Sequence, residues 1–212
     1  MDNIDISQKI KNIIEKTKQY IDENLMPIII EKRELLEGNL FTDHHTIVYT
    51  DYFIPKVENI CFLTMNKNIK NVMEIGFNSG FSSLLMLISN PNIKITCFDI
   101  GEHSYTVPCY NKIKEDFGDR INLILGDSKK TLCKFNEKQD LIHIDGGHTD
   151  DVALSDMYNS YRLSKDKTII IMDDYNFTNL KSLWDEFVKN HDLKYVNVFH
   201  STHCHDIKQV FF

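Results

Sequence analysis

The residues best suited to chemistry lie at the ends of two apolar runs in the second half of the chain. Asp145 follows the run 140–144, and Asp173 and Asp174 follow the run 168–172. If both runs are neighbouring parallel strands, their carboxyl ends meet at one edge of a sheet and bring the three carboxylates together. Like charges this close resist ionising together unless a cation neutralises them, and oxygen-only donors suit Mg²⁺. The sequence therefore predicts a magnesium site formed by Asp145, Asp173 and Asp174.

A histidine lies where it could act on a substrate held at that site. His148 follows Asp145 by three residues, and the two glycines between them allow a tight turn back toward the carboxylates. A metal ion that binds a hydroxyl lowers its pKa, and an imidazole can take the proton. We therefore expect Asp145 and His148 to be catalytic. The structural alternative is a solvated loop at Asp173 and Asp174 and a helix-start role for His148.

A glycine-bearing turn earlier in the chain predicts a binding loop. Residues 72–83 read as a short strand, a turn that carries Gly76 and Gly80, and a helix that begins near Phe81. Glycines let a backbone approach a ligand closely, and the first turn of a helix directs unpaired N–H groups at it. The spacing differs from the G-x-G-x-x-G of dinucleotide-binding folds, which argues against an NAD-dependent oxidoreductase. The residues expected to contact a cofactor in this segment are Glu74, Gly76, Asn78, Gly80 and Ser82.

Two further strand ends carry residues that suit a nucleoside. Asp99 ends the next apolar run, where a carboxylate can accept hydrogen bonds from both ribose hydroxyls. Asp127 and Ser128 end the run after it, where they can reach the amine and ring nitrogens of an adenine. Alternatively, Asp99 caps a turn, and Asp127 or Ser128 is the N-cap of the following helix. Their joint occurrence behind the glycine loop favours cofactor binding.

Together these motifs resemble the class I S-adenosylmethionine-dependent methyltransferases, motifs I to III in order. Within that group, I-D-G-G-H followed by D-D-Y resembles the magnesium-dependent sugar O-methyltransferases of macrolide biosynthesis, the macrocin type, over about residues 70–175. The resemblance implies that Asp145, Asp173 and Asp174 bind Mg²⁺ and that His148 is the base. This chain is short and lacks the long N-terminal extension of the macrolide enzymes, so the resemblance does not transfer the identity of the substrate.

The pattern of apolar runs predicts an α/β fold. Strands that are apolar on both faces alternate with amphipathic helices, which is typical of a parallel sheet covered on both sides. We expect a Rossmann-like, doubly wound, mostly parallel seven-stranded sheet that ends in an antiparallel hairpin. The predicted strands are 70–75, 93–98, 121–125, 140–145, 168–172, 194–200 and 206–212. The predicted helices are 80–89, 105–117, 128–135, 150–163 and 178–190.

The first third of the chain predicts a helical extension. Isoleucines at helical spacing favour an amphipathic helix over 6–25, ended by Pro27. A second helix is expected over 31–37 with Gly38 as its stop, and a third from residue 51 into the first strand.

We divide the chain into a helical segment, 1–68, packed on a methyltransferase domain, 69–212, the two forming one structural unit. Packing of the first helix on a second subunit, as a homodimer, stays open.

Composition narrows the partners and the compartment. The formal net charge is −7 and no basic patch occurs, which argues against nucleic acid and against an anionic membrane. No apolar run approaches the length of a membrane span. The five cysteines are widely spaced and odd in number, which favours free thiols in a reducing compartment. We therefore expect a cytoplasmic protein with a small-molecule partner.

Two histidine-containing segments have no assigned role. His and Cys residues at 200–205 could bind Zn²⁺, but a hairpin turn does not easily aim all of them inward, so substrate contact is favoured. His44, His45 and Tyr49 are candidates for a lid.

The sequence thus predicts an O-methyltransferase that uses S-adenosylmethionine and Mg²⁺ on a small hydroxylated molecule, with a sugar or sugar nucleotide favoured. A catechol-type acceptor is an alternative, because vicinal phenolic hydroxyls would chelate the same ion. A catalytically inactive domain that keeps the fold for protein interaction is another. DNA amino-methyltransferases are disfavoured, since Asp145-Gly146-Gly147-His148 replaces their N/D-P-P-Y/F motif.

Overall fold

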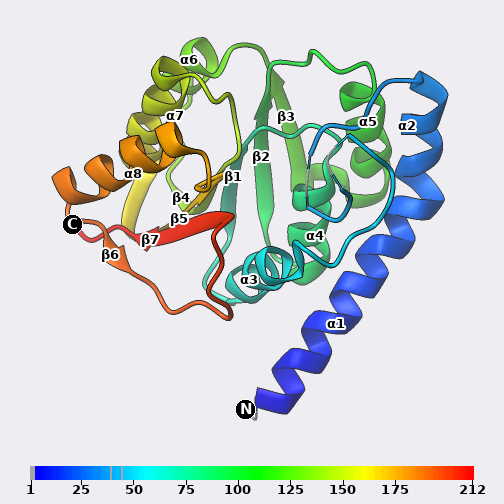
Figure 1. Ribbon diagram of the computed structural model, residues 1–212, viewed down its shortest axis with the longest axis horizontal. Helices are drawn as coiled ribbons and strands as arrows, with labels where there is room; N and C mark the ends of the chain where they lie inside the picture. Colours follow the sequence, from blue (N-terminus) through cyan, green and yellow to red (C-terminus); the bar gives the residue numbers. More distant parts are fainter. Residues whose placement is uncertain (1–2, 39, 44) are drawn as a thin grey trace.

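The computed structural model describes residues 3–38, 40–43 and 45–212, and its centre is one seven-stranded sheet (Figure 1). The strand order is β3-β2-β1-β4-β5-β7-β6. Strands β1 to β5 are parallel to one another, and β7 runs antiparallel to both β5 and β6. The strands are β1 Asn71–Ile75, β2 Lys94–Asp99, β3 Ile121–Leu125, β4 Gln139–Ile144, β5 Ser164–Asp173, β6 Lys194–Tyr195 and β7 His205–Gln209. The predicted doubly wound sheet with its terminal antiparallel pair is therefore confirmed.

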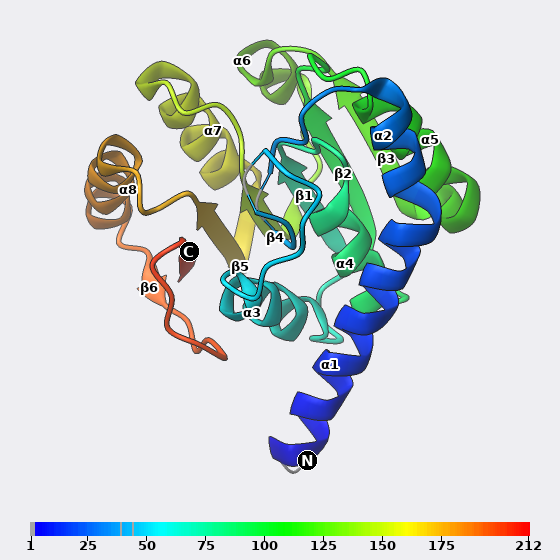
Figure 2. The same cartoon turned by 45° about the vertical axis from the view of Figure 1, so that its right-hand side comes forward.

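Helices cover both faces of the sheet (Figure 2). The longer helices are α1 Asn3–Tyr20, α2 Met26–Lys32, α3 Ile54–Thr64, α4 Phe81–Ser89, α5 Thr106–Phe117, α7 Asp150–Leu163 and α8 Thr178–Asn190. A short helix α6 Ser128–Thr131 continues as a 3-10 turn, Leu132–Lys134, and a second 3-10 turn, Gly118–Arg120, follows α5. None of the described helices is both long and apolar enough to cross a membrane.

Alternate residues of each strand enter two different hydrophobic clusters. On β1, Val72 packs in the cluster that contains the apolar faces of α1 to α5, whereas Met73 packs in the cluster that contains α7 and α8. Both faces of the central strands are therefore buried, which explains why their sequences read as nearly continuous apolar runs. Glu74 and His143 interrupt the runs on the α3–α4 face and are completely buried there.

The order of the strands locates the ligand crevice. From β1 the chain winds outward to β2 and β3, and from β4 it winds in the other direction to β5. In open α/β sheets the loops that follow two such strands separate at their carboxyl ends and leave a crevice. The loops after β1 and β4 meet there, since the N–H of Asp145 donates to the carbonyl of Ile75 at 2.8 Å.

The N-terminal segment differs from the prediction at Pro27, which does not end the first helix. Helix α1 continues through a π-helical turn, Ile21–Leu25, into α2. Pro27 lies in the first turn of α2, directly after this wider turn, which is where a helix accommodates a proline. The helix ends instead at Arg33, which adopts a left-handed conformation with φ 54°.

The predicted helix over 31–37 is wrong, because residues 34–38 are irregular. The strand predicted over 194–200 is also too long, since β6 ends at Tyr195. Asn59 of α3 explains the early end: its side chain donates to the carbonyl of His200 at 2.9 Å and accepts from the N–H of His200 at 2.8 Å. These two bonds hold the segment after β6 against α3 instead of in the sheet.

Candidate active site

A cavity of ≈ 380 Å³ opens where the predicted functional segments converge, at the carboxyl ends of β1, β4 and β5. This volume lies within the range typical of small-molecule sites. Its lining residues come from the glycine loop, from the loops after β4 and β5, and from the turn before β7. The N-terminal segment contributes Leu36, Glu37, Gly38, Leu40, Thr42, Tyr52 and Phe53. The predicted site residues in the lining are Gly76, Asn78, Ser82, Asp145, His148 and Asp174.

Gly76 occupies the point of closest approach between two of these loops. Its φ is +93°, and its N–H donates to the carbonyl of Phe98 at 2.7 Å. A Cβ at this position would lie 1.8 Å from the carbonyl oxygen of Asp145. Only glycine therefore fits, because any side chain would collide with the backbone of the loop after β4.

We expect Gly76→Ala to lower the free energy of unfolding by about 1–3 kcal/mol and to weaken S-adenosylhomocysteine binding at least about tenfold. The reason is that both loops must move apart to admit the methyl group. Urea denaturation and calorimetry measure the two effects. Gly118→Ala is the matched control, since Gly118 also has positive φ but a Cβ added there would meet nothing within 4 Å. Equal effects of the two substitutions would contradict the close approach as the cause.

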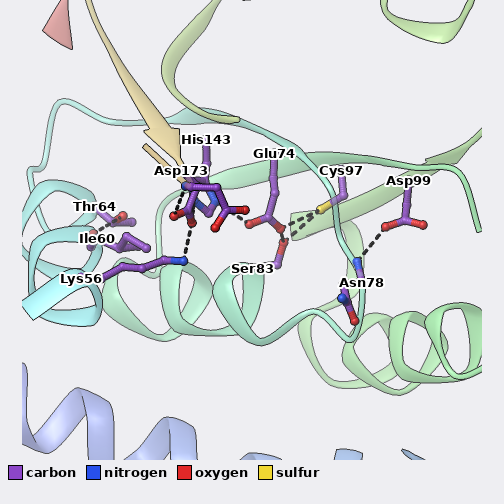
Figure 3. A network of polar contacts seen from close by, with 11 residues as sticks. Lys56, Ile60, Thr64, Glu74, Asn78, Ser83, Cys97, Asp99, His143 and Asp173 are labelled. Carbon is purple, nitrogen blue, oxygen red and sulfur yellow. Dashed lines mark hydrogen bonds and ion pairs between the residues drawn. The ribbon is translucent and has the colours of Figure 1, made fainter. Parts of the chain in front are cut away.

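Asp99 is held at the end of β2 by two backbone donors, of which Figure 3 shows Asn78. The N–H of Asn78 donates to Asp99 Oδ2 at 2.7 Å, and the N–H of Gly101 donates to Oδ1 at 2.7 Å. Each oxygen accepts one such bond and keeps a further lone pair for a ligand. The side-chain oxygen of Asn78 is buried and has no hydrogen-bond partner among the described residues. An orphaned acceptor beside an oriented carboxylate fits a ligand that carries hydroxyl and amine donors, such as S-adenosylmethionine.

Asp127 caps α6, which is the structural alternative foreseen for it. Its Oδ1 accepts from the N–H of Lys129 at 3.0 Å. Neither Asp127 nor Ser128 lines the cavity, although the N–H of Gly126 donates to the carbonyl of Asp99 at 2.8 Å and so keeps the two loops adjacent. A contact from Asp127 and Ser128 to an adenine stays a prediction.

Glu74 lies away from the cavity, in contrast to its predicted contact with the cofactor. It is completely buried between the sheet and α4, where its Oε2 accepts from the hydroxyl of Ser83 and its Oε1 accepts from His143 Nδ1 at 3.0 Å. Gly80 is also outside the cavity lining. It is the N-cap residue of α4, with φ +82°.

A buried chain of charges runs from Glu74 to the edge of the sheet (Figure 3). His143 Nε2 donates to Asp173 Oδ2 at 3.1 Å, and Lys56 Nζ lies 2.5 Å from the same oxygen. Burial opposes the charged form of His143, but its hydrogen bonds to Asp173 and Glu74 raise its pKa to about 10. Burial also opposes the charged form of Lys56, yet the carboxylates of Asp173 and Asp145 hold its pKa above the usual value. Asp173 is ionised, because burial is outweighed by Lys56 and His143, which lower its pKa.

Two residues of this buried network of charged side chains, His143 and Lys56, are not predicted at the site from the sequence. His143 could have been singled out, because a histidine inside an otherwise apolar strand needs a polar partner, although the sequence does not identify that partner. Lys56 gave no such signal in its amphipathic helix.

The cavity side of this edge carries a histidine–aspartate pair. His148 Nε2 lies 2.8 Å from Asp174 Oδ2, and the ring of His148 packs on Phe177 with centroids 4.7 Å apart. The hydrogen bond to Asp174 raises the pKa of His148. Asp174 has φ 53°, and its N–H donates to Asp173 Oδ1 at 2.8 Å, so the two adjacent carboxylates take different directions. Burial and the neighbouring Asp173 raise the pKa of Asp145 to about 7.

The three predicted metal ligands converge, but their donor set fits Mg²⁺ only in part. Asp173 Oδ2 already accepts from Lys56 and His143, and Oδ1 accepts from the N–H of Asp174. One ligand atom each of His143, Asp145 and Asp173 lie within 4.8 Å of one another, yet a doubly hydrogen-bonded imidazolium has no lone pair for a metal. Asp145 and Asp174 are the carboxylates that line the cavity.

The histidine-rich turn and the N-terminal segment both reach the cavity. His203 and Cys204 line it, in line with the expected substrate contact, whereas His200 pairs with Glu58 and His205 with Asn59. No zinc-binding group forms from this turn within the described parts of the chain.

The predicted lid residues lie elsewhere. His44 is outside the described residues, and neither His45 nor Tyr49 lines the cavity. Leu36, Glu37 and Gly38 line it instead. His103 holds this stretch through Glu34 at 2.6 Å and Glu37 at 3.1 Å.

Parts of the chain are similar in sequence to known methyltransferases. Residues 73–175 match the family model of a methyltransferase domain, a span that contains the glycine loop and the four acidic strand ends at Asp99, Asp127, Asp145 and Asp173. A bifunctional methyltransferase of Rickettsia bellii is 38% identical over 77 residues, which are 35% of this chain and 14% of that protein. The chain spans less than half the length of the curated relatives it matches.

Solved structures share the fold. A putative caffeoyl-CoA O-methyltransferase from Staphylococcus aureus superposes with a TM-score of 0.64 at 15% identity, covering 94% of this chain and 99% of that one. An O-methyltransferase from Bacillus cereus in complex with S-adenosylhomocysteine gives a TM-score of 0.64 at 13% identity, covering 96% and 100%. The fold is thus that of the class I S-adenosylmethionine-dependent methyltransferases. Residues 73–175 are in addition similar in sequence to a methyltransferase domain.

Proposed function

We propose that the protein transfers a methyl group from S-adenosylmethionine to a hydroxyl oxygen of a small molecule, with a sugar or sugar nucleotide as the favoured acceptor. The observation that carries the proposal is the His148–Asp174 pair, which lines the same cavity as Gly76 and Asn78 of the glycine loop. A base and a cofactor loop that share one cavity can bring an acceptor oxygen to a bound methyl donor.

The His148–Asp174 pair indicates which nitrogen would accept the proton of the acceptor hydroxyl. His148 Nε2–H donates to Asp174, which leaves Nδ1 as the basic nitrogen. The acceptor hydroxyl gives its proton to Nδ1, and its oxygen forms the new bond to the methyl carbon. S-adenosylmethionine, when bound, supplies that methyl group on a sulfonium, and the electrons of the broken S–C bond stay on sulfur. Asp174 holds the ring in place and stabilises the imidazolium that forms, as in other histidine–carboxylate pairs.

Oxygen is favoured over nitrogen as the acceptor atom for two reasons. The structures described above are named as O-methyltransferases, and a hydroxyl needs the base that His148 provides, whereas many amines do not. A catechol-type acceptor is the alternative within the same chemistry. A non-catalytic interaction domain is the alternative outside it, and would leave the aligned pair and the orphaned Asn78 oxygen without a role.

Mg²⁺ bound by Asp145, Asp173 and Asp174 stays a separate hypothesis. Such an ion would lower the pKa of the acceptor hydroxyl. Because Asp173 is already paired with Lys56, Asp145 and Asp174 would hold the ion. The proton transfer to His148 does not require it.

The proposal is tested by incubating the protein with S-adenosylmethionine and separate panels of sugar nucleotides, simple vicinal diols, catechols and amines. Release of S-adenosylhomocysteine is measured together with the mass and linkage of the product. We expect an O-methyl product from the sugar or diol panels. Methylation of amines alone, or no turnover on any panel by protein that binds S-adenosylhomocysteine, would contradict it.

A further inference from the structure

The first turn of α3 places a lysine among the carboxylates that the sequence assigns to a metal. The side chain of Lys56 is 1% exposed, and its Nζ lies 2.5 Å from Oδ2 of the completely buried Asp173. The negative charges of Asp145 and Asp174 also help to hold the pKa of Lys56 above its usual value. A buried ammonium costs several kcal/mol unless it is paired, so these carboxylates determine where the charge lies.

The lysine reaches this place from a helix that is fixed at both sides of the residue. Helix α3 begins at Ile54, and the Phe53 ring lies 6.0 Å from the ammonium. One turn further along, Asn59 makes its two hydrogen bonds to the backbone of His200. The ammonium is therefore presented by a packed element and not by a mobile surface chain.

The charges around Lys56 alternate and are matched within the protein. Glu74, His143, Asp173 and Lys56 form a continuous chain of contacts in which acidic and basic side chains alternate. Asp173 is already engaged on this side, because Oδ2 has both His143 and Lys56 as partners, and Oδ1 accepts from the N–H of Asp174 and keeps one lone pair. A divalent ion in the same position would have to displace a cation that is already paired.

We propose that Lys56 supplies the cation for the carboxylates of Asp145, Asp173 and Asp174 at the edge of the sheet. It is a positioning residue, whose ammonium occupies the place where the sequence predicts Mg²⁺ and holds these carboxylates together without a bound metal. The inference rests on the proposed function for the role of these carboxylates in methyl transfer. Whether the cation beside them is Lys56 or a metal is tested by metal-binding measurements, which need no methyl transfer. The inference explains how three neighbouring carboxylates coexist, and it makes the base His148 independent of metal.

The inference predicts that removing the ammonium creates a metal site. Lys56→Met keeps most of the length and the apolar stem but leaves the carboxylates without their cation. Because oxygen-only clusters bind hard divalent ions, Mn²⁺ should then bind where the ammonium was. Lys129→Met is the matched control: it removes a charge paired at 2.6 Å with Asp151, on an exposed surface.

The experiment measures thermal unfolding and calorimetric Mn²⁺ binding at constant ionic strength, with EDTA-treated protein as the reference. Wild type and Lys129→Met should show no shift in Tm with Mn²⁺. Lys56→Met should unfold at a lower temperature and recover about 5–10 °C at 100 times the dissociation constant. Adding Asp145→Asn to Lys56→Met should abolish the gain, which a merely structural role of Lys56 would not predict.

Two outcomes overturn the inference. The first is Mn²⁺ binding by wild type with a Tm shift similar to that of Lys56→Met, which would mean that the lysine and a metal coexist. The second is a folded Lys56→Met protein with no response to Mn²⁺. If Lys56→Met does not fold, Mn²⁺ binding by the wild-type protein decides between the two cations. Tight Mn²⁺ binding would contradict an ammonium at this place, and no Mn²⁺ binding would support it. Titration of the same samples with S-adenosylhomocysteine separates this inference from the proposed function.

Discussion

Replacing His148 with alanine is expected to lower the turnover number of methyl transfer by about 10²–10⁴-fold while leaving S-adenosylhomocysteine affinity nearly unchanged. In the proposed mechanism the imidazole is the base, which lies 2.8 Å from Asp174, whereas cofactor binding is assigned to Asn78, Asp99 and the glycine loop. Steady-state kinetics with a confirmed acceptor, combined with calorimetry, measure the two quantities. His45→Ala is the control, since His45 is exposed and outside the lining.

The pH dependence tests the same role. Because Asp174 raises the pKa of His148, the free base forms only at higher pH, and the rate should rise as the pH passes through that pKa. Asp174→Asn removes the carboxylate, so the rise should begin at lower pH and reach a lower maximum. A His148→Ala protein that turns over normally but binds S-adenosylhomocysteine poorly would assign the histidine to the cofactor instead.

His143→Leu is expected to lower the free energy of unfolding by about 3–5 kcal/mol, because it leaves two buried carboxylates without the cation between them. His143 is completely buried and contacts Glu74 at 3.0 Å and Asp173 at 3.1 Å. Urea denaturation followed by circular dichroism measures the loss. The control is Ile142→Val, on the same strand, for which removal of one methyl group should cost about 0.5–1.5 kcal/mol.

The sign of the pH effect on this stabilisation follows from the raised pKa. His143 has a pKa of about 10 in the folded protein and about 6.5 in the unfolded chain. Its contribution is therefore complete below about pH 6.5 and falls as the pH rises toward 10. The stability difference between wild type and His143→Leu should shrink over that interval. A difference that stays constant from pH 6 to pH 10 would contradict an imidazolium at this position.

The sheet and the carboxylates at its edge could be predicted because they depend on local patterns. Apolar runs that alternate with helices set a parallel sheet, and residues that follow such runs lie at its carboxyl edge. On that basis Asp145, Asp173 and Asp174 were expected together, and the structure brings them together.

The parts that could not be predicted depend on long-range packing and register. Glu74 meets His143 because they are paired residues of β1 and β4, and neither strand's sequence specifies that register. Lys56 meets Asp173 because α3 packs beside the sheet edge after an irregular segment, whose path has no sequence period. The helix continues past Pro27 by way of a π-helical turn, which the helix propensities of the residues do not predict.

The most direct test of the central claim is calorimetric titration of the wild-type protein and Asp99→Ala with S-adenosylhomocysteine, with and without Mg²⁺. Asp119→Ala is the control, an exposed acid at the end of α5. We expect wild type and Asp119→Ala to bind equally, with or without Mg²⁺. Asp99→Ala should bind about 10–100-fold more weakly, because hydrogen bonds from the ribose hydroxyls to the carboxylate are lost. No binding by folded wild-type protein would contradict the assignment of this cavity to S-adenosylmethionine.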